Sequence, residues 1–217
     1  MRERTVVMEK VSNYEKQCEQ WRERFLSMDQ AALCRKLPEL EADEEQLRLW
    51  HFGRQFAVGR ADGVIRCRTD SRPITYAETM NIYTHFHYCT PGARLTGQWM
   101  PFRDLRHASP FAAAFQRGTI LPLARAFSGH EDLLPGAVER LRGIALPGGG
   151  YQLPAFACIP MRLYFWDADD EFEAQANLLF DQSATDFIHV ESVVTIAGEG
   201  VSQLVEAAGL RLDDSAL

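Results

Sequence analysis

A cluster of acidic side chains between two apolar runs is the first feature of this sequence that could do chemistry. Four acids lie close together and a fifth ends the following apolar run: Asp167, Asp169, Asp170, Glu171 and Asp181. Carboxylate oxygens are the ligands that Mg²⁺ and Ca²⁺ prefer, but Phe172 and Leu178 occupy the glycine and glutamate positions of an EF-hand loop. The acids therefore fit either a charged hairpin turn or a cation site completed by Asp181. Because the turn has no glycine, we expect any cation there to bind weakly.

The segment His85-Phe86-His87-Tyr88-Cys89 offers further ligands for a transition metal. On a strand, its two histidines and its cysteine would share one face. The upstream segment Thr75-Tyr76-Ala77-Glu78 is a capping box, which predicts a helix on which only His85 and Cys89 align. The alternatives are a metal site and a helix end with a partly buried histidine.

A third candidate site consists of arginines and aromatic residues that could bind an organic anion. Arg66 and Arg68 share a predicted strand face, and guanidinium groups bind carboxylate or phosphate in bidentate fashion. Two aspartates nearby make a salt-bridged outer sheet face the alternative. Trp99 and Arg103, from a second aromatic-rich segment, complete this candidate ligand-binding set.

Recognisable catalytic motifs are absent from the sequence. It contains no phosphate-binding G-x-x-x-x-G-K-[ST], no dinucleotide-binding G-x-G-x-x-G, no G-x-S-x-G elbow and no H-E-x-x-H. The cysteines are odd in number and form no C-x-x-C pair: Cys18, Cys34, Cys67, Cys89 and Cys158. This pattern is typical of reduced thiols. We therefore predict no catalytic residue and no cofactor.

The composition is that of an ordinary globular protein. The chain has 217 residues, of which 46% are hydrophobic and 24% charged, and its formal net charge is −7. An acidic balance disfavours nucleic acid and anionic membranes as partners. No apolar stretch is long enough to span a membrane, and residues 1–30 lack a secretory pattern. We expect a cytoplasmic protein, a monomer or weak dimer, folded as one domain over residues 1–217.

Hydrophobic periodicity predicts an α+β fold in which several helices pack on an antiparallel sheet of about five strands. The expected elements are an amphipathic helix at about 8–28, a hairpin turning at Asp62-Gly63, an edge strand at 97–102, a central hairpin 155–166/172–180, a helix at 190–208 and a frayed tail at 211–217. Trp99 and Trp166 fall in predicted strands, so we expect both indoles to be buried, with truncation costing about 3–5 kcal/mol.

Three segments together resemble a known family. The segment Leu95-Thr96-Gly97-Gln98-Trp99-Met100-Pro101-Phe102, then Trp166-Asp167-Ala168-Asp169-Asp170-Glu171-Phe172, then Leu178-Leu179-Phe180-Asp181 is similar to domain-of-unknown-function family 3786. Ala168 and Glu173 depart from the glycine and proline usual there. The resemblance covers roughly residues 12–207 and implies an anaerobic source, with some members associated with corrinoid and iron–sulfur proteins of one-carbon metabolism. Any such cofactor would belong to a partner, since this chain lacks cluster ligands.

Two functions remain open from the sequence. The first is a non-catalytic module that binds a small molecule or a protein partner, accessory to corrinoid or one-carbon metabolism by resemblance. The alternative is a metal-assisted hydrolase or transferase that uses the acids 167–171 together with Asp181.

Overall fold

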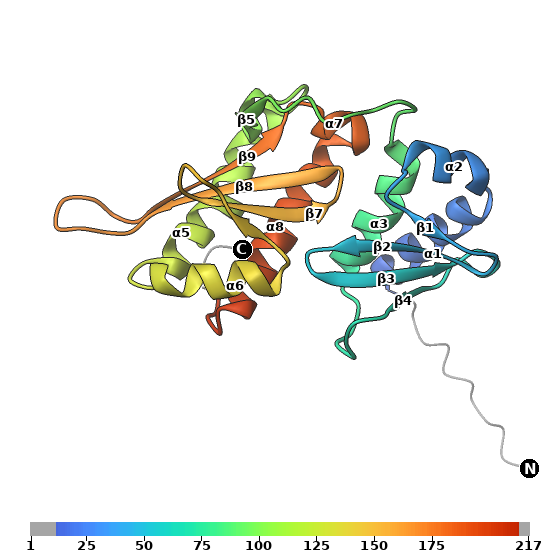
Figure 1. The fold of residues 1–217 in the computed structure, drawn as a ribbon, viewed down its shortest axis with the longest axis horizontal. Helices are drawn as coiled ribbons and strands as arrows, with labels where there is room; N and C mark the ends of the chain where they lie inside the picture. Colours follow the sequence, from blue (N-terminus) through green and yellow to red (C-terminus); the bar gives the residue numbers. More distant parts are fainter. Residues whose placement is uncertain (1–11, 213–217) are drawn as a thin grey trace, which may run out of the picture.

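The computed structural model describes residues 12–212, which form two lobes around two antiparallel sheets (Figure 1). We call residues 12–96 the N-terminal lobe and residues 97–212 the C-terminal lobe. All strand pairs are antiparallel, which confirms the predicted α+β class. The single sheet of about five strands is instead one sheet of four strands and one of five.

The N-terminal sheet has the order β1-β2-β3-β4 and lies against helices. Its strands are β1 (Glu41–Ala42), β2 (Gln46–His51), β3 (Arg54–Gly59) and β4 (Ile65–Cys67). The predicted turn at Asp62-Gly63 connects β3 to β4. Sequence patterning missed the tighter hairpin between β2 and β3, where Phe52 and Gly53 both adopt positive φ (43° and 80°).

Three helices complete the N-terminal lobe, and a side-chain cap defines where each of them begins. They are α1 (Asn13–Leu26), α2 (Gln30–Lys36) and α3 (Tyr76–Tyr88). Thr75 and Glu78 form the predicted capping box of α3, so the segment from His85 to Cys89 is the end of a helix. Helix α1 packs on α3 and falls within the predicted range 8–28, of which residues 8–11 lie outside the described part.

The C-terminal sheet has the order β5-β9-β8-β7-β6, with the predicted central hairpin in its middle. Its strands are β5 (Trp99–Pro101), β6 (Ile144–Ala145), β7 (Tyr151–Phe156), β8 (Ile159–Trp166) and β9 (Gln175–Asp181). The expected strand 155–166 is interrupted, because residues 155–156 end β7 and Ala157-Cys158 form the turn into β8. Pro101 lies in the edge strand β5, where no neighbour needs its missing N–H.

The β8–β9 hairpin extends away from the rest of the molecule, at the left of Figure 1. Trp166 lies near its tip and is 55% exposed, so the prediction that this indole is buried was wrong. The strand pattern placed Trp166 correctly at the end of β8, but no helix of residues 12–212 covers that end of the sheet. Trp99 is half-buried beneath the guanidinium of Arg162, which lies 3.9 Å from the ring centroid.

The remaining helices belong to the C-terminal lobe. They are α4 (Ala112–Phe115), α5 (Leu121–Phe127), α6 (Leu134–Arg140), α7 (Ala184–Phe187) and α8 (Val190–Ala207), with short 3₁₀ turns at Phe102–Asp104, Ser109–Phe111 and Glu131–Leu133 and a π-helical turn at Gln116–Ile120. Helix α8 follows the predicted range and contacts α3 of the other lobe. Within residues 12–212, no helix combines the length and apolarity that crossing a membrane requires.

A close contact at the β2–β3 turn joins the two lobes. Phe52 is buried against α8, and a Cβ added to Gly200 would lie 2.5 Å from its ring. Glycine at position 200 is therefore what allows the aromatic ring to approach the helix backbone. Buried apolar residues of both lobes belong to one continuous hydrophobic cluster, which holds the junction in a fixed arrangement.

Candidate functional site

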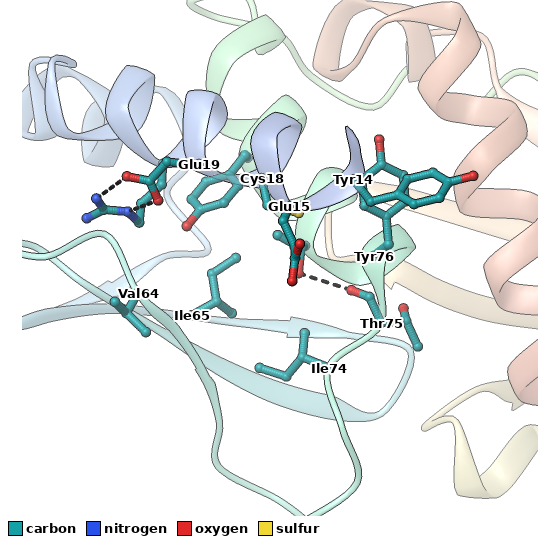
Figure 2. A pocket seen from close by; sticks show the side chains of 12 residues that line it. Tyr14, Glu15, Cys18, Glu19, Val64, Ile65, Ile74, Thr75 and Tyr76 are labelled. Carbon is teal, nitrogen blue, oxygen red and sulfur yellow. Dashed lines mark hydrogen bonds and ion pairs between the residues drawn. The ribbon is translucent and has the colours of Figure 1, made fainter. Parts of the chain in front are cut away.

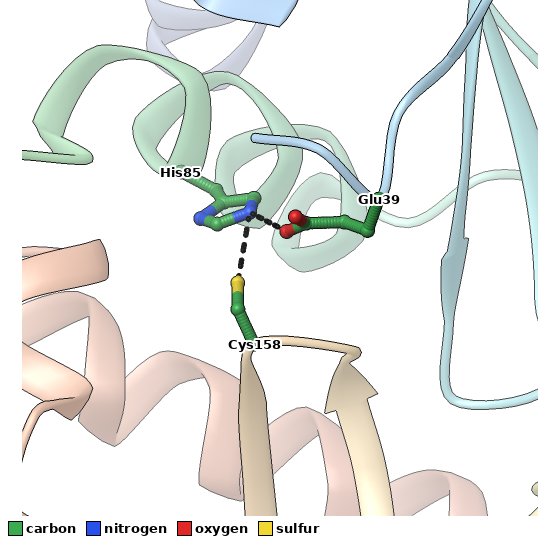
Figure 3. Close-up of side chains that lie close together, drawn as sticks. All are labelled: Glu39, His85 and Cys158. Atoms are coloured by element: carbon green, nitrogen blue, oxygen red, sulfur yellow. Dashed lines mark hydrogen bonds and ion pairs between the residues drawn. The ribbon is translucent and has the colours of Figure 1, made fainter. Parts of the chain in front are cut away.

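Three side chains with metal-binding atoms meet at the junction of the lobes (Figure 3). Glu39 precedes β1, His85 lies on α3, and Cys158 lies in the turn between β7 and β8. His85 Nε2 is 3.5 Å from Glu39 Oε1 and 3.6 Å from Cys158 Sγ. One ligand atom from each of the three residues lies within 4.8 Å of the others, and no other such group of three occurs within residues 12–212.

Contacts with neighbouring residues fix both the ring plane and the hydrogen bonding of the His85 imidazole, and both matter for metal binding. Its ring is fully buried and stacks on Phe156 with centroids 4.4 Å apart. Its Nδ1 lies 3.3 Å from the carbonyl oxygen of Phe187, a contact that would hold the hydrogen on Nδ1 when a cation is bound. In that tautomer Nε2 would present its lone pair toward Glu39 and Cys158. A backbone carbonyl in this position is a common partner for a metal-binding histidine.

A second histidine stacks on the opposite side of Phe156. His51 is fully buried, and its ring lies 4.4 Å from that of Phe156. Its Nδ1 donates to the carbonyl of Ala155 at 2.5 Å, and Asn81 Nδ2 lies 3.3 Å from its Nε2. Burial lowers the pKa of His51 to about 3, so this imidazole is neutral in the folded protein near pH 7.

We expect His51 to make the fold acid-sensitive. Between pH 6.5 and about 3, the unfolded chain binds a proton at His51 and the folded chain does not, so stability falls as the pH falls. The loss attributable to this group is about 2 kcal/mol between pH 6.5 and pH 5. Urea unfolding of the wild type and of His51→Gln at both pH values measures it. Equal losses in the two proteins would contradict the prediction.

The arrangement around Nε2 favours a cation over a nucleophilic cysteine. Glu39 Oε1 is buried and makes no hydrogen bond of ordinary geometry to any described residue. Burial acts to raise the pKa of Glu39, but the neighbouring imidazole and thiol lower it by more, so the carboxyl is an anion. Burial and the charge of Glu39 both raise the pKa of Cys158, which keeps the thiol protonated. A carboxylate beside the thiol therefore opposes formation of a free thiolate nucleophile.

Two of the three distances between ligand atoms match those around a tetrahedral zinc ion, and the third is no longer than 4.8 Å. With Zn–S near 2.3 Å and Zn–N and Zn–O near 2.0 Å, tetrahedral ligand atoms lie about 3.3–3.6 Å apart. The distances from His85 Nε2 to Cys158 Sγ and to Glu39 Oε1 agree with this range. Nitrogen, sulfur and oxygen together suit Zn²⁺, and a bound cation would deprotonate the thiol.

A cavity of about 630 Å³ opens onto the same residues. Glu39 and Cys158 line it, whereas His85 lies behind them and is fully buried. Its walls carry basic groups from both sides of the opening, namely Arg35, Lys36 and Arg94. The Lys36 ammonium donates to the carbonyl of Cys89 at 3.0 Å, which fixes its position at the end of α3. A local excess of positive charge on an acidic protein favours small anions.

The predicted acidic turn connects β8 to β9, and its carboxylates bind backbone amides. Asp169 Oδ1 accepts from the amides of Glu171 and Phe172, and these bonds lower the pKa of Asp169. Asp167 Oδ1 accepts from the amide of Gly129 at 2.7 Å. Asp170 lies in the same exposed turn. These contacts are those of a charged hairpin turn, one of the two alternatives that the sequence suggested for these acids.

Asp181 lies at the opposite end of β9 from that turn. It is six residue steps along the strand from Gln175, a distance of about 20 Å. Its buried carboxylate accepts five hydrogen bonds from backbone and hydroxyl groups of Thr96, Gly97 and Ser183. Burial acts to raise the pKa of Asp181, but these bonds lower it to about 2. Asp181 therefore fixes the loop before β5, and the structure does not bring it to the acidic turn.

The predicted anion-binding residues lie in different lobes. Arg66 of β4 and Arg68 just after it are exposed, and Arg66 pairs with Asp62 at 2.9 Å. Trp99 is in β5, and Arg103 follows it with 74% of its side chain exposed. The four residues do not converge on one site. For Arg66, the structure shows a salt bridge on the outer face of the sheet, which was the alternative to an anion-binding role.

A second cavity, of about 420 Å³, lies between α1, β4 and α3 (Figure 2). Tyr14, Cys18, Ile65 and Tyr76 are among the side chains around it. Glu19, at its edge, pairs with Arg22. Metal-binding atoms do not cluster there among the described residues, so the junction cavity is the stronger candidate.

Comparison with known proteins places the chain in a family. A family model described as "Domain of unknown function (DUF3786)" matches residues 30–203. The chain belongs to the DUF3786 family. No curated protein and no solved structure matches it. Glu39, His85 and Cys158 all fall within the DUF3786 region, whereas α1, which covers the second cavity, precedes it.

Sequence reasoning on this DUF3786 chain found one residue of the cluster and missed two. His85 was considered as a ligand, but with His87 and Cys89 from its own segment. Cys89 instead lies at the end of α3 with its Sγ 4.0 Å from the carbonyl of Lys36. Glu39 does not stand out in the sequence as a ligand, and Cys158 falls in the expected strand 155–166. The available signals were a histidine on the apolar part of α3 and a polar thiol within an apolar run.

Proposed function

We propose that this protein is a binding module built around one thiophilic divalent cation, Zn²⁺, held by Glu39, His85 and Cys158. The observation that carries the proposal is the convergence of three different ligand types on one point, with His85 Nε2 3.5–3.6 Å from the other two atoms. Glu39 Oε1, a buried carboxylate oxygen that makes no hydrogen bond of ordinary geometry to a described residue, supplies negative charge that a cation would neutralise.

The cation would leave one coordination position free. Three protein ligands and an open fourth position are the arrangement of zinc sites that bind exchangeable molecules, whereas purely structural sites use four protein ligands. Since Glu39 and Cys158 line the junction cavity, the open position faces that cavity. This supports a role in ligand binding. The corrinoid or iron–sulfur partner suggested by the family resemblance stays a prediction, as does a cytoplasmic location.

Zinc titration tests the proposal. We expect one Zn²⁺ per chain with a dissociation constant in the micromolar range or tighter, measured by competition with a chromophoric chelator. Glu39→Gln keeps the shape of the side chain and removes its charge, so affinity should fall about tenfold or more. Asp169→Asn in the acidic turn is the matched control and should leave affinity unchanged. Stoichiometric binding that responds to Asp169→Asn and not to Glu39→Gln would refute the proposal, as would the absence of saturable binding.

A further inference from the structure

We infer that the junction cavity binds a small organic carboxylate, whose oxygen occupies the open coordination position of the metal. This inference rests on the proposed zinc site and names the class of ligand it takes. The three residues of the cluster differ in how exposed they are. His85 is fully buried, Glu39 is 18% exposed at its side chain, and Cys158 is partly exposed. The side from which a ligand can reach a shared metal is therefore the cavity side.

The charges around the cavity favour an anion. Arg35, Lys36 and Arg94 line it together with one acid, Glu39, whose charge the metal would neutralise. Arg35 is 71% exposed and is 3.9 Å from Asp29, and no ion pair involving Arg94 occurs within residues 12–212. Arg94 therefore has no competing ion pair among the described residues, and Arg35 has only a long, exposed one with Asp29. The fork of N–H donors of a guanidinium group matches the two oxygens of a carboxylate.

The apolar part of the wall favours an organic anion over inorganic phosphate. Pro38, Ala93, Leu95 and Phe187 line the same cavity. Leu95 is 47% exposed, so its side chain adds apolar surface to the cavity wall. A ligand with a short hydrocarbon chain would cover such surface, whereas phosphate would leave it in water. The cavity volume of about 630 Å³ is in the range of small-molecule sites.

Calorimetry on the full chain tests this inference with butyrate, acetate and inorganic phosphate as probes. After zinc loading, butyrate should bind about tenfold more tightly than acetate, because it buries two further methylene groups. Phosphate should bind more weakly than butyrate. Without zinc, butyrate affinity should fall at least tenfold. Arg94→Gln should weaken butyrate binding several-fold in the zinc-loaded protein, and Arg103→Gln, an exposed arginine outside the cavity, should not change it.

The outcomes separate the two proposals. If the chain takes up zinc but shows no saturable butyrate binding, the carboxylate inference fails and the metal site stands. Equal butyrate binding with and without zinc, or tighter binding of phosphate, also overturns the inference. If the chain takes up no zinc, the proposed function fails and the inference fails with it.

Discussion

Replacing Cys158 with serine should weaken zinc binding by about 100-fold or more. The substitution preserves the size of the side chain but replaces a soft thiolate ligand with a hydroxyl. Removing a residue that only orients a metal ligand already lowers metal affinity by about 10–100-fold, so the loss of a ligand should lower it at least as much. Thermal unfolding gives a second readout. At free zinc equal to 100 times the dissociation constant, binding adds about 2.7 kcal/mol of stability, or about 5–10 °C in Tm for a chain of this size.

The same zinc concentration should shift the Tm of Cys158→Ser by only about 1 °C. Cys89→Ser is the matched control, because Cys89 is a buried thiol near the end of α3 that is not a member of the cluster. It should keep the full zinc-dependent shift. A zinc-dependent shift of equal size in all three proteins would contradict the assignment of Cys158 as a ligand.

Replacing Glu78 with alanine should destabilise the fold by about 3–5 kcal/mol, because it removes the buried acidic partner of Arg54 and leaves further donors without their acceptor. Glu78 is fully buried and accepts from Arg54 Nη1 at 2.6 Å, from Gln203 Nε2 and from the amide of Thr75. Arg54 is only 4% exposed and would retain Asp70 alone as an acidic partner. The substitution also removes half of the capping box of α3.

Denaturant unfolding at pH 7 measures this effect. The control is Arg106→Gln, which breaks the exposed ion pair with Asp186 and should cost at most about 1 kcal/mol. A loss below about 1 kcal/mol for Glu78→Ala would show that the Arg54–Glu78 pair contributes little to the junction. Because Gln203 lies on α8, the predicted loss also reflects the contact between the two lobes.

Local signals in the sequence predicted many of the elements correctly. The capping box at Thr75 and Glu78 fixes the start of α3, and the Asp62-Gly63 turn lies between β3 and β4. These features depend on residues close together in the chain, where propensity and hydrogen bonding decide the conformation. The exposure of Trp166 was predicted wrongly, because whether a helix covers the end of a strand depends on packing between distant segments.

The candidate site was largely beyond the reach of local patterns for the same reason. Glu39, His85 and Cys158 come from three separate elements, and their convergence depends on how the two lobes meet. That junction is set by Phe52 entering the space above Gly200 and by Phe156 stacking between two histidines. Neither arrangement has a periodic signature. The acidic turn was easy to recognise in the sequence, because its residues are adjacent in the chain. In the structure, however, the carboxylates of Asp167 and Asp169 accept hydrogen bonds from backbone amides.

The absorption spectrum of the protein with Co²⁺ in place of Zn²⁺ is the most direct test of the metal site. We predict one Co²⁺ per chain, with visible bands of tetrahedral intensity and a near-ultraviolet band from sulfur-to-cobalt charge transfer. The charge-transfer band should disappear in Cys158→Ser and persist in Cys89→Ser. A pale, octahedral spectrum without the sulfur band, or a sulfur band that survives in Cys158→Ser, would contradict a metal centre formed by Glu39, His85 and Cys158.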